Sequence, residues 1–439
     1  MGQRERATSH RRCVVPMSLH PYQAALVSRV YTTWAAGSRS VVLQLGTGGG
    51  KTHTAASILR EETGPVVFAA HLDSLVGDTA KRLREAGTPC GIVAPWAPPT
   101  PSERIQVCSL GTLHARGTRP PAGLVVLDEC HRSEAPTVSG ILADYPEARI
   151  LGLTATPQRG DGQGLDGSFD AMVCGPSVRE LTAMGALVPA VMVVPCDEGK
   201  RGDAVAELRR LRGAWRALVF CESREEARYT VERLTDAGHP AGYIDGETPR
   251  KERERLRVAL RARELHALVG VSVFVEGFDE PSVDVVALDA AFGTLGRYLQ
   301  AIGRGVRAHP GKTACTVLDV RGAVFQHLPP DVEHEWSLTG EAVTQRLAGL
   351  AFSRCEACWA VFPKAKVCPR CGVSALVKAL PVRRLQAAAK MAKLEAMPIE
   401  KRRERRYFQL VHVGMSRRRM RQEEAMQWAR AQAEKDFPR

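Results

Sequence analysis

The amino-acid sequence predicts an α/β protein with two tandem lobes, each a parallel sheet flanked by helices, followed by a small metal ribbon and a basic helical tail. Two observations support the two lobes. From about residue 17 to 325, short apolar runs rich in β-branched residues alternate with amphipathic helical patterns, which is typical of βαβ units. In addition, the 439 residues exceed the ~250–300 at which a single hydrophobic core usually stops growing.

The expected strands are short apolar runs bounded by glycine, proline or charged residues. In the first lobe they span residues 40–45, 65–70, 104–110, 123–128 and 149–154. In the second lobe they span residues 216–221, 266–273, 283–289 and 314–320. Residues 223–236 predict a helix, because Ser223 and Glu226 have the spacing of a capping box and apolar residues recur on one face.

Changes in composition divide the rest of the chain. We expect a basic arm over residues 1–16, the first lobe over 17–195, the second lobe over 196–325, a linker over 326–350, the ribbon over 351–375 and the helical tail over 376–439. The tail holds 17 lysines and arginines against seven acidic residues, so it carries +10 of the net charge of +13. Basic ends on a neutral body are expected if the ends bind a polyanion; a solvated helical face or a disordered tail is the alternative.

The sequence shows no sign of a membrane or secreted protein. No apolar run approaches the ~20 residues that span a bilayer, and the N-terminus lacks the apolar region of a secretory signal. Eight of the 12 cysteines are scattered singly, several of them within apolar runs, as expected for small buried side chains in a reducing compartment. We therefore expect a cytoplasmic location.

A glycine-rich turn within LQLGTGGGKTHTAA (43–56) predicts a phosphate site between a strand and a helix. Glycines lack a Cβ atom, so backbone N–H groups can turn inward around phosphate oxygens, and the helix adds the positive end of its dipole. Lys51 would reach the β- and γ-phosphates of ATP, and the Thr52 hydroxyl would bind Mg²⁺. Leu45 stands where the strict P-loop pattern has glycine. The turn itself consists of Gly46, Thr47, Gly48, Gly49 and Gly50.

The apolar run GLVVLDECH (123–131) contains two acidic residues, about 77 residues after the P-loop lysine. Ligands bind at the carboxyl ends of parallel strands, so Asp128 would hold Mg²⁺ through water, and Glu129 would polarise the attacking water. Adjacent acids are common on protein surfaces. After four apolar residues and downstream of a P-loop, however, they indicate an ATPase site.

With these two motifs, the chain resembles the superfamily II helicases of the DEAD/DEAH-box and type III restriction-subunit kind. Over residues 17–325, six motifs of these helicases occur in the family's order. They are HPYQ (20–23), the P-loop, LDECH (127–131), GLTATP (152–157), SVFVEGFDEPSVDVV (272–286) and QAIGRGVR (300–307). The resemblance implies that both lobes are RecA-like and that ATP binds in the cleft between them. One departure is AHLD (70–73), which places leucine where the family often has a phosphate-binding arginine.

The roles of the family's residues carry over to the matching positions in this chain. Gln23 would read the adenine of ATP, and Gln300 would face the hydrolytic water. Arg304 and Arg307 would reach the γ-phosphate from the second lobe, a contribution of about 10³–10⁵ in rate. The remaining residues act between the lobes: Gly277 and Asp279 at the nucleotide interface, and His131, Thr154 and Thr156 in coupling the ATP state to lobe movement.

The four clustered cysteines lie in CEACWAVFPKAKVCPRCG (355–372), as two CxxC pairs separated by nine residues. Two chelating turns of thiolates predict a tetrahedral Zn²⁺ site; an iron–sulfur cluster or a redox pair is the alternative. Little sequence surrounds them, so metal binding would supply the folding free energy. Trp359 and Phe362 would either stack on bases or cap the metal site. The predicted ligands are Cys355, Cys358, Cys368 and Cys371.

These features predict an ATP-dependent helicase or translocase that hydrolyses ATP to move along or unwind nucleic acid. The restriction-like motif, the ribbon and the tail favour DNA over RNA, and the basic runs 402–406 and 417–421 would track the phosphate backbone. Two alternatives remain. One is a motor that translocates without unwinding, with protein partners in replication, repair or restriction. The other is a zinc-ribbon binding module whose ATPase acts as a clamp.

The tail is loosely similar to C-terminal segments of phage and bacterial helicases. This similarity predicts the cytoplasm of a bacterial or phage-infected cell as the location of the protein.

Overall fold

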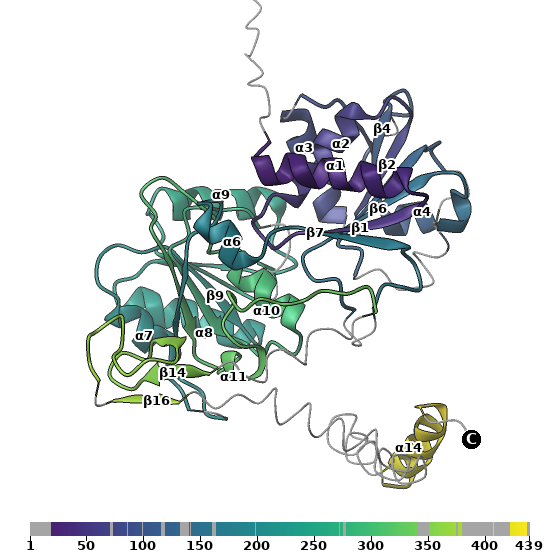
Figure 1. Cartoon of the computed structure of the whole chain (residues 1–439). Helices are drawn as coiled ribbons and strands as arrows, with labels where there is room; N and C mark the ends of the chain where they lie inside the picture. The colour runs from purple at the N-terminus through teal and green to yellow at the C-terminus, as the bar shows by residue number, and fades with distance from the viewer. Residues whose placement is uncertain are drawn as a thin grey trace, which may run out of the picture. The chain divides into compact units, whose positions relative to one another are not determined.

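The apolar runs of the sequence form two parallel sheets and one small antiparallel sheet in the computed structural model of the chain (Figure 1). The structure describes residues 19–70, 73–85, 87–98, 100–115, 119–131, 140, 142–159, 164–197, 199–271, 273–274, 278–339, 351–374, 376–379, 407 and 422–436. Contacts divide the chain into two units, Met1–Leu380, which holds all three sheets, and Pro381–Arg439. The predicted α/β class with two tandem lobes is therefore confirmed.

The first lobe is a seven-stranded parallel sheet in the order β3-β4-β2-β5-β6-β1-β7. Its strands are β1 (Ser40–Gln44), β2 (Val66–Ala70), β3 (Gly91–Val93), β4 (Ile105–Ser109), β5 (Leu124–Asp128), β6 (Arg149–Thr154) and β7 (Ala171–Cys174). The helices are α1 (Pro21–Ala35), α2 (Lys51–Glu61), α3 (Asp73–Glu85) and α4 (Leu110–Ala115). All five predicted strands are present. The two that were missed, β3 and β7, are three and four residues long and lie at the edges of the sheet, where the apolar signal is weak.

The second lobe is a six-stranded parallel sheet in the order β10-β11-β9-β12-β13-β8. Its strands are β8 (Ala190–Val193), β9 (Ala217–Cys221), β10 (Ala241–Ile244), β11 (Ala267–Gly270), β12 (Val285–Asp289) and β13 (Cys315–Asp319). The helices are α7 (Ala204–Arg210), α8 (Arg224–Asp236), α9 (Arg250–Arg261), α10 (Leu295–Ile302) and α11 (Val324–His327). The short helix α6 (Val178–Ala183) precedes β8, and a Cβ atom on Gly46 of the first lobe would lie 3.7 Å from its Val178 side chain. The boundary predicted at residue 195 is too late, because β8 already pairs with β13 of the second sheet.

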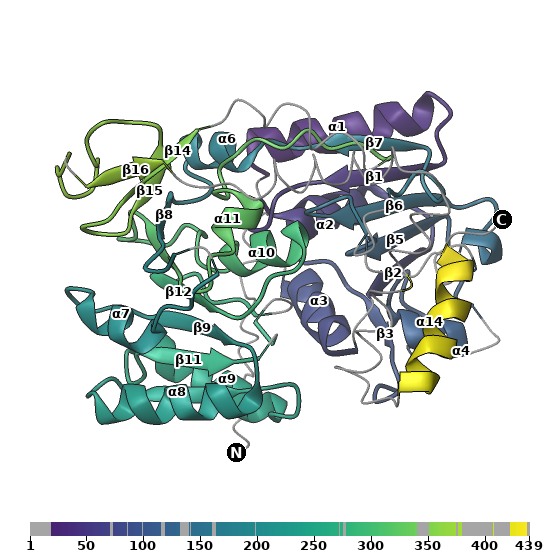
Figure 2. The ribbon, with the colours of Figure 1, turned by 90° about the horizontal axis from the view of Figure 1, so that it is seen from below.

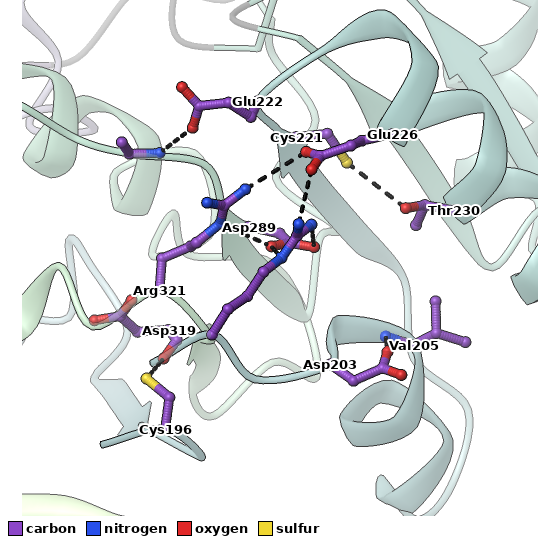
Figure 3. A network of polar contacts seen from close by, with 12 residues as sticks. Cys196, Asp203, Val205, Cys221, Glu222, Glu226, Thr230, Asp289, Asp319 and Arg321 are labelled. Atoms are coloured by element: carbon purple, nitrogen blue, oxygen red, sulfur yellow. Dashed lines mark hydrogen bonds and ion pairs between the residues drawn. The ribbon is translucent and has the colours of Figure 1, made fainter. Parts of the chain in front are cut away.

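The capping box predicted at the start of α8 forms only in part. The Ser223 hydroxyl accepts the N–H of Glu226 at 3.1 Å, as expected for an N-cap. The carboxylate of Glu226 instead pairs with Arg201 at 2.7 Å and Arg321 at 3.5 Å. Arg201 also binds the buried Asp289 through two nitrogens, at 2.9 and 3.0 Å. Figure 3 shows Glu226, Asp289 and Arg321 converging at the carboxyl ends of β9 and β12.

The predicted linker is partly a strap that joins the lobes. After α11, residues 328–339 return to the first lobe, where the carbonyl of Leu338 accepts the N–H groups of Leu165 at 2.6 Å and Asp166 at 3.2 Å. The Leu338 side chain packs against the core of the first lobe. Gly164 lies directly under the strap, since a Cβ atom on it would be 1.9 Å from the Leu338 carbonyl oxygen. The strap also borders a cavity of about 580 Å³ between the lobes.

Replacing Gly164 with alanine should therefore weaken the docking of the strap, because backbone rather than a flexible side chain occupies the space. We expect a loss of about 1–3 kcal/mol, as for other overpacked sites, and hence a lower melting temperature by thermal unfolding. Gly167→Ala is the matched control, since a Cβ atom there would have no neighbour within 4 Å. Equal melting temperatures for the two variants would contradict the docking.

The cysteine-rich segment forms a three-stranded antiparallel sheet of β14 (Phe352–Cys355), β15 (Val361–Pro363) and β16 (Val377–Ala379). β16 lies beyond residue 375, where the ribbon was predicted to end. The ribbon docks on β8: Val194 donates its N–H to the Trp359 carbonyl at 2.8 Å, and the Trp359 ring packs against the core of the second lobe. Phe362 is buried beside Cys355 and Cys368. Phe362 therefore lies against the metal-site cysteines, as the capping alternative predicts, whereas Trp359 packs on the second lobe.

The second unit is described only in part, with Tyr407 and α14 (Gln422–Asp436). Within α14, Ala429 is buried, and Trp428 and Tyr407 pack against it. The N-terminal arm and the basic runs 402–406 and 417–421 lie outside the described residues. Among the helices that are described, none has both the length and the apolar character needed to cross a membrane.

Candidate active site

The P-loop lies between β1 and α2, as the sequence predicts. Gly48 and Gly50 have φ angles of +88° and +86°, which favour glycine, so the loop turns tightly before Lys51 begins α2. Leu45, which replaces the glycine of the strict pattern, is fully buried beneath the turn. A Cβ atom on Gly49 would be 2.9 Å from its side chain. Leu45 therefore packs against the P-loop from the protein interior, and the opposite face of the loop is left as the phosphate cradle.

The two acids stand at the end of β5, opposite the P-loop. Lys51 Nζ lies 4.0 Å from Glu129 Oε1 and donates to the Leu45 carbonyl at 3.3 Å. Glu129 has a φ of +48°, an uncommon conformation for a residue other than glycine. Its N–H is donated to Asp128 Oδ1 at 3.1 Å. An unfavourable backbone conformation of this kind persists only where the surrounding structure fixes it, often at functional side chains. Here the Glu129 side chain points towards Lys51.

A chain of polar contacts runs from Glu129 into the first lobe. The His131 Nδ1 atom lies 3.5 Å from Glu129 Oε2 and 2.9 Å from the Thr154 hydroxyl. Thr154 in turn donates to the Thr156 carbonyl at 2.9 Å and accepts the Thr156 N–H at 3.0 Å. The three residues predicted to couple the nucleotide state to lobe movement are therefore joined to the predicted catalytic acid.

Gln23 contacts the P-loop from α1. Its Nε2 atom donates to the Gly49 carbonyl at 3.3 Å, and its Oε1 atom accepts the N–H of His20 at 2.9 Å. The neighbouring Tyr22 hydroxyl also donates to the Gly49 carbonyl, at 2.9 Å. The Gln23 amide is thus held at the rim of the phosphate cradle.

Residues of the second lobe face the P-loop across a cleft. The Gln300 Nε2 atom, on α10, lies 3.4 Å from Glu129 Oε2. Gly303 approaches Thr47 so closely that a Cβ atom on the glycine would be 2.4 Å from the threonine side chain. Figure 2 shows α2, α3 and α10 at the junction of the two lobes. The motif at residues 300–307 therefore lies against the P-loop and Glu129.

The cleft encloses a cavity of about 470 Å³, lined by the P-loop, both acids and the two arginines of the second lobe. This volume is within the range of small-molecule sites. The Arg304 Nη1 atom donates to the Phe278 carbonyl at 3.0 Å, and Arg307 pairs with Asp279. Burial lowers the pKa of Arg304 and of Arg307 to about 10, so both guanidinium groups remain charged at neutral pH.

Asp78 and Arg82 of α3 also line the cleft, and the sequence did not predict them. Arg82, on α3 of the first lobe, pairs with Asp279 of the second lobe at 2.8 Å. Next to it on the same helix, Asp78 pairs with Arg250 of α9 at 3.0 Å. The i,i+4 spacing of Asp78 and Arg82 would have shown that they share a helix face, but not what they meet. Gly277, the remaining predicted interface residue, lies outside the described residues.

The four clustered cysteines converge in the ribbon. Their sulfur atoms lie within 4.8 Å of one another, with Sγ–Sγ distances of 3.6 Å for Cys355–Cys371 and for Cys358–Cys368. Four thiolates at tetrahedral Zn–S distances would be about 3.8 Å apart, so the donor set fits this ion. Of the scattered cysteines, six are buried and Cys174 is half-buried, as predicted, while Cys13 lies outside the described residues.

Two known protein families match the lobes that build this cleft. The family described as "Type III restriction enzyme, res subunit" matches residues 16–159. The family described as "Helicase conserved C-terminal domain" matches residues 201–309. Together the two matches cover more than half of the chain and contain the predicted nucleotide-site residues.

Individual relatives agree with these matches. A 51.5 kDa protein of a Lactococcus phage (isolate 7-9) is 26% identical over 361 residues, which are 75% of this chain and 77% of that protein. The irc3 protein of Schizosaccharomyces pombe, described as a candidate mitochondrial ATP-dependent helicase, is 26% identical over 349 residues, 69% of this chain and 57% of that protein. The chain therefore spans little more than half the length of this helicase.

The fold is also shared with solved structures. A fragment of a candidate HsdR subunit of a type I restriction enzyme from Vibrio vulnificus YJ016 has a TM-score of 0.55 and 20% sequence identity. The similarity covers 73% of this chain and 66% of that chain, so it extends over both lobes.

Proposed function

Because this chain belongs to the superfamily II helicases and is an ATP-dependent enzyme acting on nucleic acid, we propose that it is a DNA motor driven by opening and closing of the interlobe cleft. The observation that carries the proposal is the cavity in which Lys51, Asp128 and Glu129 of one lobe face Arg304 and Arg307 of the other. An ATPase site divided in this way converts each hydrolysis event into a change in lobe separation.

ATP fits the P-loop of this chain. The left-handed glycines form a cradle of backbone N–H groups, and the Thr47 hydroxyl is buried without a hydrogen-bond partner among the described residues. Lys51 would exchange its contact with the Leu45 carbonyl for the β- and γ-phosphates. Thr52 and Asp128 would hold Mg²⁺, which neutralises phosphate charge. Gln23, at the rim, would read the adenine.

Hydrolysis would depend on residues from both lobes. Glu129 acts as general base towards the attacking water, and Gln300, at 3.4 Å from that carboxylate, positions the water. Arg304 and Arg307 stabilise the charge that develops on the γ-phosphate. Both arginines belong to the second lobe, so their contribution is available only when the cleft is closed.

Coupling to movement would use the contacts that begin at Glu129. His131, Thr154 and Thr156 form a continuous chain from the catalytic acid to the end of β6. Asp279, held between Arg82 of one lobe and Arg307 of the other, would respond to nucleotide by exchanging partners. Gly277, from the same family motif as Asp279, is the further residue that the resemblance implies for this interface.

The ribbon would bind one Zn²⁺ through Cys355, Cys358, Cys368 and Cys371, which supplies a structural cross-link. DNA is the favoured track because the family that matches the first lobe is that of a restriction-enzyme subunit. The net charge of +10 in residues 376–439 would add sequence-independent binding to phosphates.

Steady-state ATP hydrolysis measured without nucleic acid, and then with single-stranded DNA, duplex DNA, branched DNA and RNA, tests this function. We expect DNA to raise kcat several-fold and RNA to raise it less. A larger increase in kcat with RNA than with DNA would identify RNA as the track. An unchanged kcat with all four nucleic acids would overturn the proposal of a nucleic-acid motor. A strand-displacement assay on the branched DNA then separates unwinding from translocation alone.

A further inference from the structure

Lys312 follows the arginine-bearing turn and precedes β13. Its ammonium group points back into the protein and donates to three backbone carbonyls. The Pro281 carbonyl lies at 3.0 Å and the Arg307 carbonyl at 3.1 Å, and the third contact is with the Gly305 carbonyl. An ammonium group has three N–H donors, so all of them are used on the backbone of this region.

The three carbonyls belong to two segments that line the ATP cleft. Gly305 and Arg307 lie on the turn that carries the two arginines, and Pro281 follows Asp279 by two residues. Asp279, Arg304 and Arg307 line the cleft cavity, whereas Lys312 is not among its lining residues. A single side chain therefore fastens together, from behind, the two segments that present charged groups to the nucleotide.

Other contacts hold the arginine-bearing turn along its length. Gly305 packs so closely that a Cβ atom would be 2.4 Å from the Cys315 sulfur and 2.5 Å from the Val286 side chain. The Val306 carbonyl accepts the N–H of Val188 at 2.8 Å. The turn thus has little room to adjust if one of its supports is removed.

The environment of Lys312 explains why a charged group is retained there. Burial lowers the pKa of Lys312, and the nearby Asp284 opposes this effect. A half-buried lysine that is desolvated in this way is stable only if its donors are satisfied. Its removal would leave three carbonyls without this donor, each a cost comparable to a lost hydrogen bond.

We propose that Lys312 is a positioning residue for ATP hydrolysis, which holds Arg304, Arg307 and Asp279 in the arrangement that meets the γ-phosphate. The proposal rests on the function proposed above, since it assumes that the two arginines act on ATP. Lys312 itself does not touch the nucleotide. Its effect reaches the reaction through the backbone of residues 305–307 and 281.

The test uses the full chain carrying Lys312→Met, which keeps the length of the side chain and removes its charge and donors. We expect kcat for DNA-stimulated hydrolysis to fall on the order of 10²-fold, part of what an arginine finger contributes. The KM for ATP should change little, because the P-loop is untouched. Lys251→Met, at an exposed position on α9, is the matched control and should retain the wild-type rate.

A mutant cycle against the variant that lacks both arginines, Arg304→Ala/Arg307→Ala, separates positioning from loss of stability. If Lys312 acts through the two arginines, adding Lys312→Met to that variant should slow it no further, whereas independent effects multiply. Lys312→Arg keeps the positive charge but changes the geometry of the N–H donors, so its kcat should lie between those of Lys312→Met and the wild type. If Lys312→Met does not fold, the same comparison is made with Lys312→Arg.

Multiplicative effects, or a lower melting temperature with unchanged kcat, would overturn the positioning role. Wild-type rates in Arg304→Ala would instead overturn the proposed ATPase site itself.

Discussion

Replacing Glu129 with glutamine should abolish multiple-turnover ATP hydrolysis while ATP remains bound. The substitution keeps the shape of the side chain, so the left-handed backbone at this residue and the contact with Gln300 are preserved. It removes the charge that makes the side chain a proton acceptor, and general-base catalysis is typically worth about 10²–10⁴-fold. We therefore expect kcat to fall by about that factor and the Kd for ATP to remain near the wild-type value.

The comparison with Lys51→Ala makes this prediction specific. Lys51 is expected to contact the phosphates directly, so its loss should abolish turnover and weaken ATP binding as well. Glu61→Gln is the matched control, since this exposed residue ends α2 far from the P-loop lysine that begins it. Binding is measured with a fluorescent ATP analogue, and turnover by phosphate release. Retained hydrolysis in either active-site variant would show that these residues are not the ATPase site.

The sequence was sufficient for the parts of the site that depend on local pattern. A P-loop needs glycines in fixed positions before a lysine, and Gly48 and Gly50 indeed adopt the left-handed conformation. Asp128 and Glu129 follow four apolar residues, and a parallel strand that ends in this way must place them at the ligand-binding edge. The resemblance implied only that Gln300 would face the hydrolytic water; its 3.4 Å contact with Glu129, 171 positions away in the chain, is a finding of the structure.

Contacts that depend on the tertiary structure could not be predicted. Arg82 and Lys312 occupy unremarkable positions in the sequence, and their importance comes from partners that fold against them: Asp279 in one case and three carbonyl groups in the other. The lobe boundary was misplaced for a similar reason. The strand β8 joins the second sheet only by pairing with β13, some 120 residues later, and no local signal shows which sheet a short apolar run will join.

The ribbon illustrates the same limit, and it leads to the second large effect. Its cysteine spacing predicted a metal site, but no local pattern showed that the ribbon is attached to a lobe. In the structure, Arg354 donates to the Cys196 carbonyl and pairs with Asp197 at 2.9 Å, and the Arg354 guanidinium lies 5.1 Å from the centre of the Trp359 ring. These contacts, with the packing of Trp359 on the second lobe, join the ribbon to the edge strand β8 and to the residues that follow it.

Removing the metal should therefore unfold the ribbon and also lower the stability of the second lobe. The described core cluster of the ribbon is small: its buried residues are Cys355, Ala360, Phe362 and Cys368, with Cys358 and Val377 packed against them. Metal binding in such domains is worth about 10–16 kcal/mol, which the apo ribbon cannot replace. We expect one Zn²⁺ per chain by elemental analysis, and a fall in the melting temperature of the full chain after treatment with a zinc-selective chelator in the absence of ATP.

Substitution of a ligand separates the metal from other effects of the chelator. Cys368→Ser should lose the bound zinc and reproduce the lower melting temperature, because a neutral hydroxyl replaces a thiolate ligand. Cys174→Ser, at a half-buried cysteine of the first lobe, should retain one zinc and the wild-type stability. If the ribbon were an independent module, Cys368→Ser would lose zinc without any change in the unfolding of the second lobe. In that case β8 would remain paired in the second sheet without its contacts to Trp359. Iron in place of zinc would identify a different metal centre on the same four thiolates.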